Sequence, residues 1–406
     1  MEPCDILVTG GSGFLGQHVI GLLQTRADHV TEIRVLDMVH YENKLDYKHS
    51  KPVKTYVGSV TDEKILKEAC HGVRCVIHIA GIPDSSMFPD KERINKVNIQ
   101  GTLLTLLAAL GTAGVQRFIY CSSVSVAIGN NDVTDGIRED DPIPSKRLFE
   151  PYASSKLAGE RFVMAANGPT FRTVCLRPLV MWGELDSTFV QLSLKSAAQT
   201  FGYLPRIQCG KIAHHNAYVG NVAWGFVCAE IKLYNDLKRS DVRGSMSNHE
   251  KDERNRAEFC SELRRRSKRM GSNLDENEDL KDVNSDLKES TANIYYLVDD
   301  TPPNNTYDFL KPFLNASGYK MTEFACPLVL FAIVYWIIFG ILFIVRLFGF
   351  KVNFPVADGL IGFNKRTYVF NDDKAREELN YRPLYSPEVA FERSIKYYKK
   401  CSNNVS

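Results

Sequence analysis

The residues VTGGSGFLG, from Val8 to Gly16, are the strongest indication of the fold of this 406-residue chain. It joins an apolar run, DILVTG, to an amphipathic segment, FLGQHVIGLLQTR, so we expect a strand to end and a helix to begin there. In such a turn Gly10 permits the tight bend, Gly13 lets the backbone approach a pyrophosphate, and Gly16 lets the helix pack close to the sheet. The helix N-terminus then offers backbone N–H groups and a partial positive charge to phosphate groups. The sequence therefore predicts a dinucleotide-binding turn.

The pattern that begins at this turn continues to about residue 128. The short runs EIRVLD, VKTYVG, CVIHIAG and RFIYCSS are rich in Val and Ile and end in Gly, Asp or Ser, and longer amphipathic segments lie between them. A further strand, RTVCLRP, follows a helix that starts near Tyr152. Strands that alternate with helices predict βαβ units and a parallel sheet. We therefore predict an α/β chain with a Rossmann-type doubly wound parallel sheet over residues 1–180.

The second strand ends in Asp37, about twenty residues beyond Gly16. A carboxylate at this place accepts hydrogen bonds from the adenosine ribose hydroxyls and repels a 2′-phosphate. This favours NAD as the cofactor over NADP. The alternative is an aspartate that only caps the turn after the strand.

Tyr152 and Lys156, in YASSK, are four residues apart and therefore share one face of a helix. A tyrosine normally ionises near pH 10, and a nearby ammonium favours the phenolate and lowers that pKa. Ser122 or Ser123, in YCSSVSV, lies about thirty residues upstream at a strand end, on the sheet edge where ligands bind. Ser, Tyr and Lys together suit hydride transfer from an alcohol: Tyr removes the proton, Ser bonds the same oxygen, and Lys holds Tyr and the cofactor ribose.

Composition excludes several other functions. The net charge of +2 gives no reason to expect nucleic acid, and none of the ten cysteines forms a C-x-x-C pair, so no metal site is predicted. His214 and His215 have no Cys or carboxylate at metal spacing, so we place them on the substrate-side loop. The first residues lack a basic and apolar signal pattern, and we expect reduced thiols facing the cytosol.

Two later segments depart from the alternating pattern. Residues 235–293 are dense in charged residues, Asn and Ser, which predicts a disordered or loosely helical insertion. Residues 327–345, PLVLFAIVYWIIFGILFIV, carry no charge and are about long enough to span a bilayer. Because the tail after this run looks like part of the substrate domain, we favour a monotopic anchor or a re-entrant helical pair. A buried core helix and a single-pass helix are the alternatives.

These motifs resemble the extended short-chain dehydrogenase/reductase superfamily. TGGSGFLG is similar to its glycine turn, HIAG to its cofactor turn after a strand, Asn98 in KVNIQGT to its structural asparagine, and SS…YASSK to its catalytic set. Within the superfamily the chain resembles the 3β-hydroxysteroid dehydrogenase/Δ5→4-isomerase family. That resemblance is carried by FIYCSSVSVA, LRPLVMWGE, AYVGNVAWGFVCA, YYLVDDTP, the late apolar run and KAREELNYRPLYS, and it covers nearly all of the chain except residues 235–293.

The resemblance implies an NAD-dependent dehydrogenase that oxidises a 3β-hydroxyl on a steroid or sterol, with Δ5→Δ4 isomerisation left open. It implies Tyr152, Lys156 and Ser123 as the catalytic residues, and Asp299 and Asp300 as the candidate isomerase pair, although an Asp-Asp before Thr-Pro is also good turn chemistry. The predicted cofactor-binding residues are Gly10, Gly11, Ser12, Gly13, Phe14, Leu15, Gly16, Asp37, Val60, Ala80, Gly81, Tyr152 and Lys156.

Two alternatives stay open. One is a sterol-4α-carboxylate 3-dehydrogenase, for which Arg177, Arg206 or Lys211 could bind the substrate carboxylate. The other is a non-catalytic NAD-binding scaffold. The expected partners are a steroid or sterol and membrane lipid, without nucleic acid, and a homodimer is left open. We expect the endoplasmic reticulum membrane, with the catalytic domain facing the cytosol, and the mitochondrial membrane as second choice.

The predicted organisation therefore has five parts. They are a cofactor domain at 1–180, a substrate-binding part at 181–234 and 294–324, the charged insertion at 235–293, a membrane anchor at 325–348, and a C-terminal part at 349–406 that packs back on the substrate domain.

Overall fold

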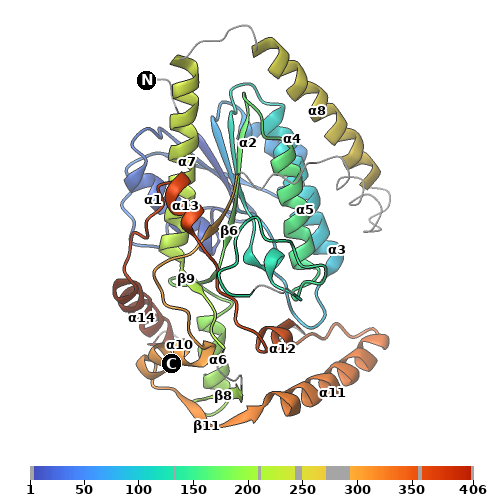
Figure 1. The fold of residues 1–406 in the computed structure, drawn as a ribbon, viewed down its shortest axis with the longest axis vertical. Helices are drawn as coiled ribbons and strands as arrows, with labels where there is room; N and C mark the ends of the chain where they lie inside the picture. Colours follow the sequence, from blue (N-terminus) through green and yellow to red (C-terminus); the bar gives the residue numbers. More distant parts are fainter. Residues whose placement is uncertain are drawn as a thin grey trace.

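The computed structural model describes residues 4–130, 134–208, 212–242, 249–270, 293–354 and 359–403. Its centre is a sheet of seven parallel strands in the order β10-β6-β5-β4-β1-β2-β3 (Figure 1). The strands are β1 (Ile6–Thr9), β2 (Ile33–Asp37), β3 (Val53–Val57), β4 (Cys75–His78), β5 (Arg117–Cys121), β6 (Arg172–Pro178) and β10 (Ile294–Leu297). This confirms the predicted doubly wound α/β fold.

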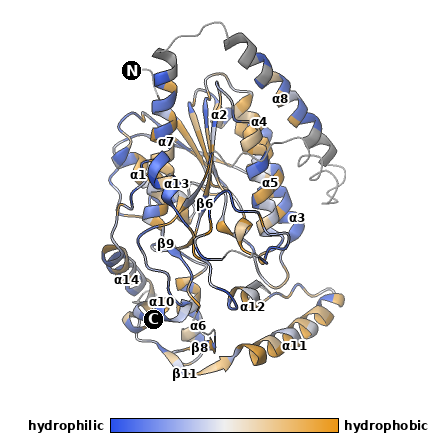
Figure 2. Ribbon diagram, in the orientation of Figure 1, coloured by the Kyte–Doolittle hydropathy of each residue, from blue (hydrophilic) through white to orange (hydrophobic). Residues whose placement is uncertain are grey.

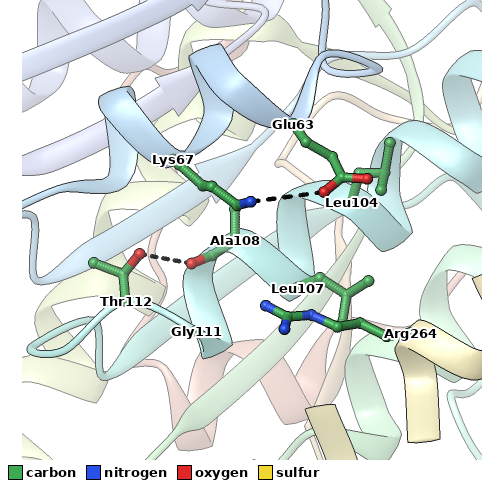
Figure 3. Close-up of a pocket in the computed structure, with 8 residues that line it drawn as sticks. All are labelled: Glu63, Lys67, Leu104, Leu107, Ala108, Gly111, Thr112 and Arg264. Carbon is green, nitrogen blue, oxygen red and sulfur yellow. Dashed lines mark hydrogen bonds and ion pairs between the residues drawn. The ribbon is translucent and has the colours of Figure 1, made fainter. Parts of the chain in front are cut away.

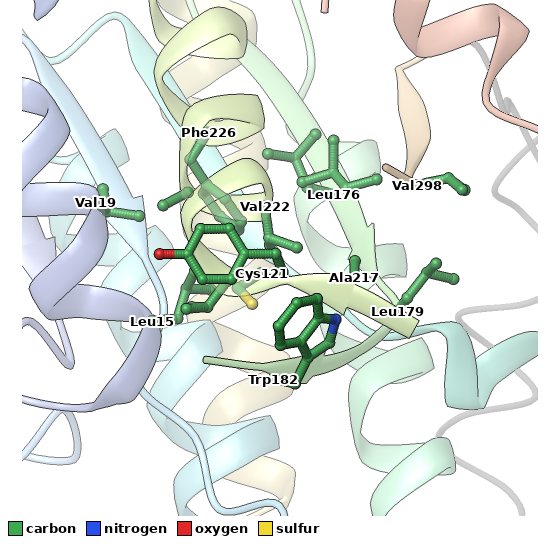
Figure 4. Packing of buried hydrophobic residues seen from close by; sticks show 14 of the residues in the cluster. Leu15, Val19, Cys121, Leu176, Leu179, Trp182, Ala217, Val222, Phe226 and Val298 are labelled. Atoms are coloured by element: carbon green, nitrogen blue, oxygen red, sulfur yellow. The ribbon is translucent and has the colours of Figure 1, made fainter. Parts of the chain in front are cut away.

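Helices cover both faces of the sheet, which is why its central strands are continuous apolar runs. On one face α1 (Phe14–Arg26) packs against α7 (Val219–Val242). Figure 4 shows the core that these two helices make with the strands, where Val19 and Phe226 lie near Cys121 and Leu176. On the other face lie α2 (Glu63–Cys70), α4 (Gly101–Leu110) and α5 (Tyr152–Ala165), and the short helices are α3 (Lys91–Ile94), η1 (Asn95–Gln100) and η2 (Val124–Ala127).

The strand order reverses between β1 and β4. From β1 the chain builds outward to β2 and β3, and it then crosses to β4 and continues in the opposite direction. In open parallel sheets ligands bind beyond the carboxyl ends of the strands at such a switch point. The fold therefore directs attention to the loops after Thr9, His78 and Cys121.

The smaller part of the molecule is built below that edge. Strand β7 (Val180–Trp182) pairs with β9 (Asn216–Tyr218), and β8 (Tyr203–Gln208) pairs with β11 (Lys320–Pro327). Trp182 is fully buried there, with Phe309, Phe313 and Phe391 rings 4.6–5.7 Å from it. These rings come from α10 (Thr306–Ala316) and α14 (Pro387–Asn403), and α6 (Val190–Gln199) completes the layer.

The C-terminal tail packs back on this part. The Tyr398 hydroxyl donates to the Gly183 carbonyl at 2.7 Å, and the Tyr385 backbone N–H donates to the Asn221 side chain at 2.8 Å. The helix α13 (Asp373–Glu378) lies against β10, and the short helix α12 (Gly359–Phe363) precedes it.

The charged segment 235–293 is more ordered than its composition predicts, in the part that the structure describes. Helix α7 extends into it as far as Val242, and a further helix, α8 (His249–Met270), packs on α4. The Arg256 guanidinium donates to four backbone carbonyls at and after the end of α4, at 3.0–3.3 Å. Cys260 and Leu263 are buried beside it. Residues 243–248 and 271–292 of the predicted insertion lie outside the described residues.

A small cavity of about 180 Å³ lies between α2, α4 and α8 (Figure 3). Its wall includes the Glu63–Lys67 ion pair, Leu104, Gly111 and Arg264. Because Gly111 follows the end of α4, this cavity lies away from the carboxyl ends of the strands, and it does not belong to the site described below.

The apolar run forms one helix, α11 (Leu328–Leu347), with a mean hydropathy of 3.0 over its most apolar window and 6% of that window buried. Figure 2 shows it as an apolar rod along the bottom of the molecule. Among the described residues it is the one helix that is long and apolar enough to cross a membrane. The predicted start at residue 325 is wrong, because Ala325 and Cys326 pair with β8 as part of β11 and the helix begins after Pro327.

Candidate active site

The glycine turn is held in a shape that side chains would not permit. Gly10 has a φ of +71°, and a Cβ there would lie 2.8 Å from the Ala80 backbone. A Cβ on Gly16 would collide with the Gly10 carbonyl oxygen. Gly13 is the N-cap of α1, so no side chain caps the first backbone N–H groups of this helix. This is the close approach of backbone to backbone that a pyrophosphate-binding turn requires.

Not all residues predicted around this turn have the same place. Gly11 and Leu15 are buried beneath it, where a Cβ on Gly11 would meet Val35 and Ile20. At the surface of the turn Gly13 is exposed and Phe14 is partly buried, whereas Ser12 is buried and donates its N–H to Asp37. Val60 is also buried, against Gly101.

Asp37 lies beside the turn at the end of β2. Its carboxylate accepts a hydrogen bond from the Ser12 backbone N–H at 2.9 Å and from the Val39 backbone N–H at 3.4 Å. The side chain is only partly buried, so it has acceptor capacity left. Both the turn-capping contact and the ribose-binding position of the sequence analysis are therefore compatible with this carboxylate.

The turn after β4 joins the cofactor side to the catalytic helix. The Ala80 N–H donates to the Thr9 carbonyl at 3.1 Å, and a Cβ on Gly81 would lie 3.0 Å from the Lys156 Nζ. The Asn98 side chain exchanges two hydrogen bonds with the Ile82 backbone, at 2.7 and 3.0 Å, and donates to the Ser155 hydroxyl at 2.9 Å. This asparagine therefore fixes the loop after β4 to α5.

Tyr152 is the first residue of α5, and the Ser123 hydroxyl lies close enough to its phenol to lower the pKa of that group. Ser123 caps η2, where its hydroxyl also accepts from the Ser125 N–H at 3.1 Å. The Ser122 hydroxyl is buried and has no hydrogen-bond partner among the described residues. Of the two serines that the sequence left open, the structure brings Ser123 to the tyrosine.

Lys156 is buried one helical turn below Tyr152. Its ammonium donates to the Cys121 carbonyl at 2.8 Å and lies 5.2 Å from the centre of the Tyr120 ring. Burial lowers the pKa of Lys156, against the raising effects of Cys121 and Glu160.

The pKa of the Tyr152 phenol is raised, by burial and by the Cys121 thiol, and the hydrogen bond with Ser123 lowers it only in part. Lys156 is not among the groups that shift this pKa, since its ammonium is directed to the Cys121 carbonyl, and its effect on the phenolate stays a prediction.

His78 is a buried neighbour that the sequence analysis did not single out. Its two ring nitrogens are hydrogen-bonded to the hydroxyls of Thr9 and Thr102, at 2.7 and 3.0 Å. Burial and the Lys156 charge lower its pKa to about 3. The imidazole is therefore neutral and ties β1 to α4 beneath the site; a lone histidine in a strand gives no sequence signal for this.

Both candidate isomerase carboxylates already have hydrogen-bond or ion-pair partners within the chain. The Asp299 carboxylate accepts from the Tyr218 N–H, the Asn221 side chain and the Thr301 N–H, at 2.8–3.0 Å. Burial raises its pKa against these bonds. Asp300 is half exposed and forms an ion pair with Arg376 at 2.9 Å. These contacts favour the structural alternative for the pair, and its catalytic role stays a prediction.

The cations proposed to bind a substrate carboxylate also differ in availability. Arg177 is buried and forms a two-point ion pair with Glu160, at 2.8 Å for each bond, and it donates to the Tyr296 hydroxyl at 3.0 Å. The Arg206 guanidinium donates to the Glu323 carbonyl at 2.6 Å. Lys211 lies outside the described residues. Arg177 therefore has no free carboxylate-binding edge.

His214 and His215 lie before β9, and the charge of Asp135 acts on His215. His214 stacks on Phe363 with ring centres 3.8 Å apart, and burial lowers its pKa to about 4. The His215 Nδ1 accepts from the Phe370 N–H at 3.2 Å.

Cys4, His29 and Glu230 bring three metal-ligating atoms within 4.8 Å of one another. Arg117 already donates to the Cys4 thiol at 3.0 Å and pairs with Glu230 at 3.2 Å, and His29 bonds Glu230 at 2.7 Å. A guanidinium in the centre makes this cluster a buried ion-pair network rather than a site for a cation.

Solved structures share this fold at low sequence identity. The chain is similar to a UDP-glucose 4-epimerase from Thermotoga maritima solved with UDP-glucose, at 17% identity and a TM-score of 0.63, covering 98% of this chain and 99% of that chain. It is similar to a dTDP-glucose 4,6-dehydratase from Streptomyces venezuelae solved with NAD, at 16% identity and a TM-score of 0.62, covering 97% of each chain. It is also similar to a short-chain dehydrogenase/reductase superfamily protein from Agrobacterium tumefaciens with bound NAD, at 18% identity and a TM-score of 0.59, covering 99% of each chain.

One family is matched in sequence. The sequence model of the 3-beta hydroxysteroid dehydrogenase/isomerase family matches residues 7–263, which run from β1 through the glycine turn and the catalytic helix into α8. This match spans well over half of the chain, so the chain belongs to the 3-beta hydroxysteroid dehydrogenase/isomerase family, within the extended short-chain dehydrogenase/reductase superfamily.

Proposed function

We propose that the chain is an NAD-dependent dehydrogenase that oxidises the 3β-hydroxyl of a steroid or sterol to the ketone. The observation that carries this proposal is the placement of Ser123 and Tyr152 together at the carboxyl edge of the sheet, with the buried Lys156 one helical turn away on α5. Family membership supports the substrate class, and similar folds solved with NAD support the cofactor.

Each residue of the candidate site has a separate role in the proposed reaction. When NAD is bound in the glycine turn it accepts the hydride from the alcohol carbon. Tyr152 removes the hydroxyl proton, and Ser123 holds the same oxygen. Lys156 is close enough to the turn at Gly81 to meet the nicotinamide ribose, and its charge favours the phenolate. Asp37 accepts from the adenosine ribose and disfavours a 2′-phosphate.

The contacts of Asp299, Asp300 and Glu160 bear on the isomerisation step and on the choice of a 4α-carboxysterol as substrate. Because Asp299 and Asp300 are engaged in backbone and ion-pair contacts, the proposed reaction ends at the ketone. Because Arg177 is paired with Glu160, a 4α-carboxysterol is the second candidate rather than the first.

We also propose that α11 lies in one leaflet of a membrane and does not cross it. The chain enters the helix from β11, which pairs with β8, and leaves it toward Phe354, whose carbonyl accepts from the Met87 N–H at 2.9 Å. Both flanks therefore bind the same body, which a single crossing would forbid. Lys320, Arg346 and Lys351 border the apolar segment and suit contact with lipid headgroups. We place the protein on the cytosolic face of the endoplasmic reticulum, with the mitochondrial membrane as second choice.

The test is NAD⁺ reduction by the detergent-solubilised chain, with a 3β-hydroxy-Δ5-steroid and, separately, a 4α-carboxysterol. We expect NADH from the first substrate, and an absorbance scan for a conjugated enone reports isomerisation. Tyr152→Phe should bind NAD⁺ and lose turnover. Full turnover by Tyr152→Phe overturns the mechanism. If the wild type turns over only the carboxysterol, the second substrate is selected. If it forms no NADH with either substrate, the non-catalytic scaffold is selected. Protease protection of a C-terminal tag in sealed microsomes would contradict the one-sided anchor.

A further inference from the structure

The loop of residues 82–90 connects the cofactor side of the sheet to α3. Its first residue, Ile82, is fixed to Asn98, and its last, Asp90, caps α3 by accepting from the Arg93 N–H at 3.0 Å. Between them the Asp84 carboxylate accepts from the backbone and hydroxyl of Ser86, at 3.0 and 2.6 Å. The loop is therefore pinned at both ends and folded on itself.

The middle of this loop is bound to the segment that follows α11. One side chain, Asn353, accepts from the Phe88 N–H at 3.0 Å and donates to the Ser86 hydroxyl at 2.8 Å and to the Phe88 carbonyl at 3.0 Å. The Met87 N–H adds a bond to the Phe354 carbonyl at 2.9 Å. Asn353 is exposed and could bond to water instead, so burial of its side chain does not explain these hydrogen bonds.

The lipid-facing helix itself touches the same loop. The ring of Phe88 stacks on that of Phe339 in α11, with centres 5.0 Å apart, and the Arg346 guanidinium lies 4.9 Å from the Phe88 ring centre. Phe88 is thus enclosed by α11 and by Asn353. A single loop residue receives contacts from the helix and from the chain that returns from it.

The other end of the loop reaches the catalytic helix. Ile82 is bonded to Asn98, and Asn98 donates to the hydroxyl of Ser155, which lies between Tyr152 and Lys156 in α5. The loop therefore runs without interruption from the membrane helix to the wall of the site. A substrate that dissolves in lipid must pass from the side of α11 to Tyr152, and this loop contacts α11 through Phe88 and is linked to α5 through Asn98.

We propose that Asn353 is a positioning residue for the dehydrogenase reaction: it docks the 86–88 segment on α11 and so keeps open the passage by which a lipid-dissolved substrate reaches Tyr152. The inference rests on the proposed function, because it needs an apolar substrate that arrives from the membrane. Asn353 touches neither cofactor nor reacting atoms, so its effect falls on substrate access and not on the chemical step. In kinetic terms it affects KM for membrane-borne substrate and leaves kcat and NAD⁺ binding in place.

The experiment uses the full chain reconstituted in phosphatidylcholine vesicles, with two 3β-hydroxysteroids. One is apolar and partitions into the vesicles, and the other carries a sulfate on its far ring and stays in water. Asn353→Ala removes three hydrogen bonds to the loop. Because exposed bonds each contribute little net free energy, we expect KM for the apolar substrate to rise about five- to tenfold. We expect kcat, KM for the sulfated substrate and the NAD⁺ dissociation constant to stay within twofold of the wild type.

The matched control is Asn371→Ala, which removes a partly buried asparagine whose side chain exchanges two hydrogen bonds with Asp373 and has none to the loop. It should change none of these constants. A second variant, Phe88→Leu, removes the ring that stacks on Phe339 and should raise the same KM.

The outcomes separate the two proposals. A wild-type chain that reduces no NAD⁺ with either steroid overturns the proposed function and this inference with it. An active wild type with an unchanged KM in Asn353→Ala overturns the inference alone. An equal loss of kcat with both substrates also overturns it, because Asn353 would then act on the catalytic helix and not on access.

Discussion

The ammonium of Lys156 donates a hydrogen bond to the carbonyl oxygen of Cys121, 2.8 Å away, at the end of β5. This bond ties the catalytic helix to the strand that carries Ser122 and Ser123, and it holds a buried charge beside Tyr152. Replacing Lys156 by Met removes both the bond and the charge that favours the phenolate. We expect kcat to fall by about 10²–10⁴-fold, the usual range for a lost acid–base group.

The control for the fall in kcat is Lys232→Met, which replaces a partly exposed lysine of α7 that is paired with Asp236. This variant should leave kcat unchanged. Steady-state NADH formation measures both variants. A Lys156→Met enzyme with a kcat near that of the wild type would show that the ammonium has only a structural role.

Asp37 sets the preference for NAD. Its carboxylate faces the glycine turn through the Ser12 N–H, so Asp37→Ala removes the acceptor for the ribose hydroxyls. We expect the NAD⁺ dissociation constant to rise about 10- to 100-fold, as for hydrogen bonds to a charged group, and the ratio of NADP⁺ to NAD⁺ affinity to increase. Titration of protein fluorescence with each cofactor measures this, and Asp28→Ala, on the exposed turn after α1, is the control. Equal losses for both cofactors would mean that Asp37 only caps the turn.

The ion pair between Arg177 and Glu160 contributes to stability, not to recognition of a carboxylate. Arg177→Met leaves Glu160 charged and buried, so we expect the free energy of unfolding to fall by about 3–5 kcal/mol. Changing both residues to Met removes the uncompensated charge and should restore most of that loss. Urea unfolding followed by circular dichroism compares the two variants. A double variant as unstable as the single one would contradict this account.

His214 makes stability depend on pH. Burial lowers its pKa to about 4, whereas an unfolded histidine titrates near 6.5, so the unfolded chain binds the proton more readily. The contribution of the neutral form is therefore complete above about pH 6.5 and is lost as the pH falls toward 4. His214→Phe keeps a ring against Phe363 and removes this titration.

We expect the free energy of unfolding of the wild type to fall with decreasing pH in this window more steeply than that of His214→Phe, by about 1.4 kcal/mol per pH unit. Urea unfolding at pH 4.5, 5.5 and 6.5 measures the two slopes. Identical slopes would show that the imidazole is protonated in the folded chain.

Local patterns were sufficient to predict the sheet and the strands and helices that carry the candidate site residues. Contacts within one turn and with the neighbouring strand leave no room for a Cβ at Gly10 and Gly16. Because these contacts are short-range, the spacing of the glycines is visible in a single sequence. The i, i+4 spacing of Tyr152 and Lys156 likewise follows from helix geometry. The choice between Ser122 and Ser123 could not be made in this way, because it depends on how the strand end turns into η2.

Long-range contacts account for what the sequence did not indicate. Helix α8 is one of the most hydrophilic segments of the chain, and its composition predicts no packing. The Arg256 guanidinium and the buried Cys260 and Leu263 hold it on α4. Two apolar contact residues are too few to produce a hydrophobic period in the sequence. The pairing of β11 with β8 shortened the predicted apolar helix in the same way, since Ala325 and Cys326 read as apolar whether they lie in a strand or a helix.

The position of α14 after α11 in the chain has a consequence for biosynthesis. Trp182 is covered by Phe391, and Gly183 is bound by Tyr398, so the smaller part cannot close until the last helix has been made. The apolar helix is translated before that, while the body it belongs to is still open. Docking of α14 is therefore a late event in synthesis, and the exposed apolar helix α11 on an unfinished domain is the species that chaperones would have to shield.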